Sequence, residues 1–112
     1  MNTVLLEEET VLRDGWANHE LSVDSVGGQL YLTSQRLVFE CHKHDVQPED
    51  TVLALDRIES VEPAWAKFLN LIPVFPNIII VHSPGGEEHF VVYERDNWVT
   101  AIREAIAANQ PG

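Results

Sequence analysis

The sequence predicts a mainly β domain, in which about seven short strands precede one carboxy-terminal helix. Three observations support this prediction. Residues 28–40 alternate apolar and polar side chains with the period of two that is typical of strands. Further short apolar runs follow as far as Tyr93, and Pro, Gly or charged residues separate them. From Asp96 to Ala108 the apolar side chains instead recur at helical spacing.

The segment from Gly28 to Glu40 predicts a hairpin with a tight turn at Ser34 and Gln35. In this register the facing pairs are Leu30 with Phe39, Tyr31 with Val38, and Leu32 with Leu37. A shift of one residue would move the buried apolar side chains into water, so the register is strongly specified. The turn lacks the Gly or Asn that two-residue hairpin loops prefer.

The remaining elements follow from the same signals. Strands are expected at residues 14–21, 51–55, 58–62, 77–82 and 87–93, and the helix at residues 96–108. We expect Pro63 to end the 58–62 strand, and Asp96 to cap the start of the helix. The apolar stripe of the helix consists of Trp98, Ile102, Ala105 and Ile106. Residues 1–13 form an extension, either as a short helix or as an edge segment.

Length, charge and cysteine content limit the class of protein. The chain has 112 residues, the size of one domain, with a core expected within about residues 14–108. Its 18 acidic and 7 basic residues give a formal net charge of -11, which argues against a nucleic-acid partner. Cys41 is the only cysteine, so no intramolecular disulfide is expected. Residues 1–9 do not resemble a secretory signal, and no apolar run approaches the about 20 residues of a membrane span. We therefore expect a cytoplasmic protein, with a peripheral position at a membrane as the alternative.

The hairpin carries a family resemblance. Residues 28–39 resemble the G-x-L-Y-L-T-x-x-R-L-V-F signature of GRAM domains, which belong to the pleckstrin-homology-like superfamily. Residues 55–61 resemble the second block of that family, and residues 90–98 resemble its last strand and the start of its helix. The resemblance implies that residues 1–112 form one domain, a seven-stranded, partly open antiparallel barrel capped by the carboxy-terminal α-helix. It also implies binding of phosphoinositides, other membrane lipids or proteins, without catalysis.

The charge of this chain bears on the lipid function. A phosphoinositide site needs several Lys or Arg side chains around its phosphate groups. The candidates here are Arg36 and Lys43, with His42 and His44 beside Lys43 and acidic residues from Asp45 onward. Arg36 has two interpretations, as an anion contact or as a surface residue that pairs with an acidic neighbour. Binding of peripheral membrane lipid is therefore the alternative function, disfavoured by the net charge.

The segment from Trp65 to Phe75 gives the sharpest functional hypothesis. It is rich in large apolar residues, and its prolines lead us to expect a loop, in which residues 68–72 also fit a short helical turn. The candidate binding residues are Trp65, Lys67, Phe68, Leu71, Ile72 and Phe75. The loop either folds back over the barrel or is exposed, and an exposed loop would serve self-association, a partner protein or a membrane. We favour protein contact, because Lys67 is the only charge in the loop.

No combination of residues indicates an enzyme. Cys41 and His42 are adjacent, and adjacent side chains of a strand point to opposite faces, which argues against a nucleophile and base pair. His42 and His44 would share a face in a strand, but no second close pair supports a zinc site. His82 and His89 flank a turn without facing each other. We expect a binding or scaffold module without catalytic residues, metal or cofactor.

Overall fold

The computed structural model describes residues 1, 3–21, 25–41, 50–68 and 72–109, and for residues 65–68 and 72–76 it describes the backbone. The elements in chain order are β1 (Val11–Glu20), β2 (Ser25–Thr33), β3 (Arg36–Cys41), β4 (Thr51–Ala54), the 3-10 turn η1 (Leu55–Arg57), β5 (Ser60–Phe68), β6 (Ile72–Ser83), β7 (Gly86–Val92) and α1 (Arg95–Asn109).

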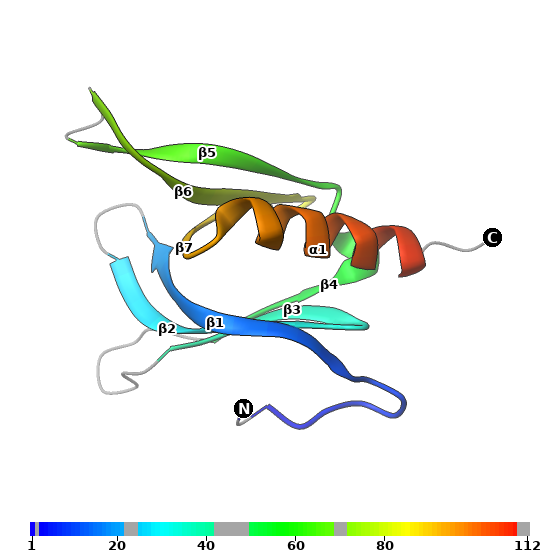
Figure 1. The fold of residues 1–112 in the computed structure, drawn as a ribbon. Coiled ribbons are helices and arrows are strands. Elements are labelled where there is room, and N and C mark those ends of the chain that lie inside the picture. The colour runs from blue at the N-terminus through cyan, green and yellow to red at the C-terminus, as the bar shows by residue number, and fades with distance from the viewer. Residues whose placement is uncertain (2, 22–24, 42–49, 69–71, 110–112) are drawn as a thin grey trace.

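The described strands form one seven-stranded sheet in the order β4-β3-β2-β1-β7-β6-β5, and every neighbouring pair is antiparallel. The sheet bends around α1, so that β1 to β4 lie on one side of the helix and β5 and β6 on the other (Figure 1). This arrangement confirms the predicted fold class, an open antiparallel β structure with a carboxy-terminal helix.

The β2–β3 hairpin has the predicted register, in which Leu30 faces Phe39 and Leu32 faces Leu37. Its turn uses a side chain in place of Gly or Asn. The hydroxyl of Thr33 accepts hydrogen bonds from the backbone N–H groups of Gln35 (3.1 Å) and Arg36 (2.8 Å). A threonine hydroxyl that binds nearby backbone groups stabilises a turn locally, which explains why this loop forms without a residue at positive φ.

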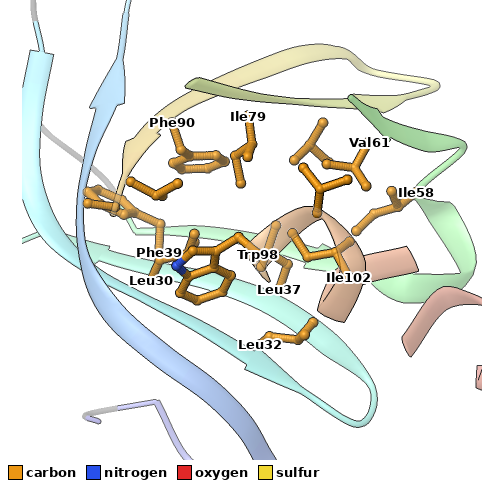
Figure 2. Packing of buried hydrophobic residues seen from close by; sticks show 14 of the residues in the cluster. Leu30, Leu32, Leu37, Phe39, Ile58, Val61, Ile79, Phe90, Trp98 and Ile102 are labelled. Carbon is orange, nitrogen blue, oxygen red and sulfur yellow. The ribbon is translucent and has the colours of Figure 1, made fainter. Parts of the chain in front are cut away.

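The core lies between the inner face of the sheet and α1. Trp98 and Ile102 of the helix pack among side chains of β2 and β3 on one side and of β5, β6 and β7 on the other (Figure 2). Trp98 is 2% exposed and Ile102 is fully buried. The predicted helical stripe is therefore confirmed for Trp98, Ile102 and Ala105, while Ile106 is partly buried against the same core.

Two arginines of α1 contact the edge strand β5. Arg103 donates from Nε (3.3 Å) and Nη2 (3.0 Å) to the carbonyl oxygen of Val61. Arg95 donates from Nη1 to the carbonyl oxygen of Ala64 at 3.0 Å. An edge strand normally offers its backbone groups to another chain. Here the helix supplies donors to two carbonyl groups of that strand.

Several predicted boundaries were wrong. Pro63 does not end a strand, because β5 is a sheet edge and an edge strand tolerates a residue without an N–H group. Leu55 begins the 3-10 turn instead of ending β4. The helix begins at Arg95, which places Asp96 in its first turn and not at the N-cap. Residues 3–9 form no helix, and β1 begins at Val11.

Candidate binding surfaces

The β5–β6 hairpin extends past the rest of the sheet. β6 pairs with β7 only from Ile78 to Ser83, whereas its pairing with β5 continues to Phe68 and Ile72. We refer to the strand residues 65–68 and 72–76 as the outer hairpin, which projects beyond the start of α1 in Figure 1. A two-stranded hairpin is at best marginally stable alone in water. Contacts outside its own ladder would therefore stabilise the outer hairpin.

The expectation of a loop from Trp65 to Phe75 was wrong for the described part of that segment. Pro73 and Pro76 lie on the part of β6 that has no β7 partner, so their missing N–H groups remove no bond to β7. The ladder with β5 is irregular between Ala64 and Ala66 and between Ala66 and Lys67. Such irregularities let a strand bend and continue. The segment therefore contains prolines and still forms two strands.

Five of the six predicted binding residues lie on the outer hairpin. Trp65, Lys67 and Phe68 belong to β5, and Ile72 and Phe75 belong to β6. The register places Phe68 opposite Ile72. Leu71 lies outside the described residues. The predicted helical turn does not form at Phe68 or Ile72, which are strand residues. The binding role of the six residues stays a prediction.

Arg36 contacts a carboxylate from its own chain. Its Nε donates to Oε2 of Glu9 at 2.8 Å, and its Nη2 donates to Oε1 at 2.7 Å. The side chain of Glu9 is fully buried and that of Arg36 is 15% exposed. The hydroxyl of Thr33 (2.5 Å) and the backbone N–H of Leu6 (2.7 Å) donate to the same carboxylate. Lys43, the other predicted anion contact, lies outside the described residues.

These donors change the acidity of Glu9. The hydrogen bonds from Arg36 lower the pKa of Glu9 from 4.5 to about 2, with help from Thr33 and Leu6, although burial opposes the shift. The same pair raises the pKa of Arg36. Glu9 is therefore ionised throughout the physiological pH range. The anion that Arg36 contacts is thus Glu9 of its own chain, and a contact of Arg36 with a ligand anion stays a prediction.

Residues 3–9, which we call the N-terminal strap, cross the outer face of β3. At one end Thr3 donates from its backbone N–H and its hydroxyl to Oε2 of Glu40, each at 2.6 Å. At the other end Glu9 binds Arg36. Val38 lies between these anchors on β3 and is fully buried, although it points away from the core. The strap was not predicted from the sequence, because its anchors join residues 37 and 27 positions apart.

His19, His82 and His89, the histidines that the structure describes, each lie near a carboxylate. As predicted, His82 does not face His89 across the β6–β7 ladder. Its Nε2 lies 2.8 Å from Oε1 of Glu62. Nε2 of His19 lies 2.5 Å from Oε2 of Glu88, and its buried ring stacks on Phe90 with ring centroids 4.7 Å apart. No group of three or more potential metal ligands occurs among the described residues. The predicted pair of His42 and His44 lies outside those residues.

The fold is that of pleckstrin-homology domains. The N-terminal PH domain of Vps36 superposes with a TM-score of 0.69 at 16% identity, over 93% of this chain and 83% of that chain. The linker-DH/PH domains of p115-RhoGEF give a TM-score of 0.72 at 14% identity, over 96% of this chain and 32% of that chain. The C-terminal domain of an unknown protein from Leishmania infantum gives a TM-score of 0.67 at 18% identity, over 90% of this chain and 87% of that chain.

At these identities the likeness establishes the fold and no more. No protein-family model and no curated protein matches the sequence. Within the described part of the chain, no helix combines the length and the apolar character needed to cross a membrane.

Proposed function

We propose that this protein is a non-catalytic binding module of GRAM type, and that it contacts protein through the outer hairpin. The proposal rests on one observation, the extension of β5 and β6 past the last pair between β6 and β7, Ile78 with Val91. The partner is either a different protein or a second copy of this chain.

The composition of the outer hairpin supports this proposal. Its large apolar residues are Trp65, Phe68, Ile72, Val74 and Phe75. Each such side chain that stays in water forgoes about 1.5–3 kcal/mol of burial. The outer hairpin is a ribbon of two strands with two faces. Its β6 edge has no pairing to β7. Contact with another protein would bury apolar side chains of this ribbon, and exposed apolar patches in general mark such contact sites.

The charge distribution favours protein over lipid as the partner. Lys67 is the only charged residue of the outer hairpin, and the net charge of the chain is -11. Anionic membrane surfaces attract clusters of Lys and Arg. Arg36 is already engaged with Glu9. Phosphoinositide binding remains the second candidate, supported by the resemblance of residues 28–39 to the GRAM signature.

The neighbours in fold are compatible with a protein-binding role. One of them is the DH/PH fragment of PDZRHOGEF in complex with human RhoA, with a TM-score of 0.65 at 12% identity, over 88% of this chain and 29% of that chain. A fold can host unrelated activities, so this likeness is only an analogy. The main support for the proposal is the outer hairpin.

A photo-crosslinking phenylalanine analogue at position 68 tests the proposal in cells of the source organism. We expect protein adducts from position 68 and none from position 100, where Thr100 is an exposed helix residue used as the control. An adduct of twice the 12.6 kDa chain mass would identify self-association. Lipid adducts alone, or equal protein adducts from both positions, would contradict it.

A further inference from the structure

The site around Glu9 has the features of a built carboxylate receptor. Arg36 offers two parallel donors, and the hydroxyl of Thr33 adds a third from β2. Paired N–H donors of one guanidinium match the two oxygens of a carboxylate in distance and direction. All three donors come from the β2–β3 hairpin. The group that they bind comes from the strap.

The strap is held mainly by side-chain hydrogen bonds. Residues 3–9 belong to no strand of the sheet. Besides its anchors at Glu40 and Arg36, the strap accepts hydrogen bonds from Arg36 Nη2 at the carbonyl oxygen of Val4 (3.1 Å) and from Gln35 Nε2 at that of Glu7 (3.1 Å). A segment held this way can leave the surface while the strands that carry the receptor stay paired.

The strap also leaves apolar surface in water. Val4, Leu5 and Leu6 are 83%, 43% and 52% exposed. Val52 of the edge strand β4 pairs with Val38, the residue beneath the strap, and is 50% exposed. Glu8 adopts a left-handed φ of 65°, which is unfavourable for a residue other than glycine. With the strap docked on its own chain, which we call the closed form, apolar side chains therefore remain exposed and Glu8 remains strained.

We propose that the outer face of β3 is a docking site for an extended acidic segment, and that two copies of the chain pair by exchanging their straps. The occupant is the strap of the second copy, because residues 3–9 are the sequence that this surface is shown to accept. Exchange of an identical element conserves every contact and is a low-cost route to a dimer. The exposed apolar residues of the strap and β4 then supply surface for contact between the copies.

Docking within one chain competes with exchange. A tethered segment acts at an effective concentration on the order of millimolar. The native chain is therefore expected to stay closed at micromolar concentration and to exchange when it is concentrated. If one chain lacks Glu9 and the other lacks Arg36, neither chain can form the Glu9–Arg36 contact internally. Docking within one chain then no longer competes, and exchange between the two chains can be detected.

Complementary variants test this inference. One chain carries Glu9→Ala, which removes the ligand, and the other carries Arg36→Met, which removes the receptor. Both also carry Phe68→Ser, so that association through the outer hairpin does not contribute. We expect each chain alone to remain at 12.6 kDa by light scattering, and their mixture to form a heterodimer of twice that mass.

A mixture that stays monomeric, while circular dichroism shows both chains folded, would overturn the inference. If either variant fails to fold, the readout is native mass spectrometry of isotopically light and heavy Phe68→Ser chains at about millimolar concentration. A mixed dimer that is lost when residues 1–9 are deleted from both chains would support strap exchange. A monomer in that experiment, or a dimer that persists without residues 1–9, would refute it without bearing on the outer hairpin.

Discussion

Glu9 and Arg36 show how one residue pair fixes an otherwise irregular segment. A buried carboxylate is costly unless it is paired and hydrogen-bonded. Glu9 meets this condition with donors from Arg36, Thr33 and Leu6. Removing either partner would leave an uncompensated charge beneath the strap. The pair therefore ties the strap to the β2–β3 hairpin.

The first prediction concerns the pH dependence of this pair. Because the pKa of Glu9 is lowered from 4.5 to about 2, its contribution to the free energy of unfolding is fully present above pH 4.5 and is lost as the pH falls toward 2. Glutamine does not titrate. Urea unfolding should show that the stability gap between the native chain and Glu9→Gln narrows by about 2 kcal/mol from pH 7 to pH 3. A gap that is constant or widens would contradict the assigned pairing.

Gly28 is a second residue-scale determinant. A Cβ atom at Gly28 would lie 2.2 Å from the carbonyl oxygen of Glu40 and 2.9 Å from Cα of Cys41, both backbone atoms of β3. Neither can move without disturbing the ladder. We expect Gly28→Ala to destabilise the protein by about 2 kcal/mol or more in urea unfolding.

Gly85 provides the matched control. A Cβ atom there meets nothing closer than 3.9 Å, and its backbone is not in the left-handed region. Gly85→Ala should change stability by no more than about 0.5 kcal/mol. Equal losses in the two variants would show that the close approach of β2 to β3 does not set the requirement for glycine.

At the scale of elements, patterns within short stretches of sequence correctly predicted the β2–β3 register and the buried face of α1. The alternation in residues 28–40 predicted the register of β2 and β3, because a one-residue slip would expose Leu30 and Leu32. The spacing of Trp98 and Ile102 predicted the buried face of α1 for the same reason. Both signals depend on residues close together in the sequence.

Predictions from the sequence were wrong where the structure depends on contacts between residues far apart in the chain. Prolines interrupt a strand only where their N–H groups are needed, and the position of β5 at a sheet edge was not readable from the chain. The contact of Glu9 with Arg36 spans 27 positions. No spacing rule links them. A loop was therefore expected at the outer hairpin, and a short helix or an edge segment was expected at the strap.

The contact of α1 with β5 gives an element-scale prediction. Arg103 donates twice to the carbonyl oxygen of Val61, so Arg103→Met should lower the free energy of unfolding by about 1–2 kcal/mol. Glu104→Met, on the same exposed helix surface, should have little effect. Calorimetry of both variants checks this. A loss from Glu104→Met as large as that from Arg103→Met would indicate a general surface effect instead of the bond to β5.

At the scale of the whole molecule, the sheet and the helix enclose one core. Two candidate binding surfaces lie outside that core. The outer hairpin extends β5 and β6 past β7, and the strap covers the outer face of β3. The chain as a whole carries a formal net charge of -11. A net negative charge repels anionic membranes. The account therefore centres on protein contact.

Liposome flotation tests this central claim most directly. The native chain and Phe68→Ser would be compared on neutral and phosphoinositide-containing vesicles, at low and at physiological salt, after circular dichroism has shown that both are folded. The account predicts that neither protein floats with either vesicle. Flotation of the native chain that is lost in Phe68→Ser would contradict it and would make the outer hairpin a membrane-binding element.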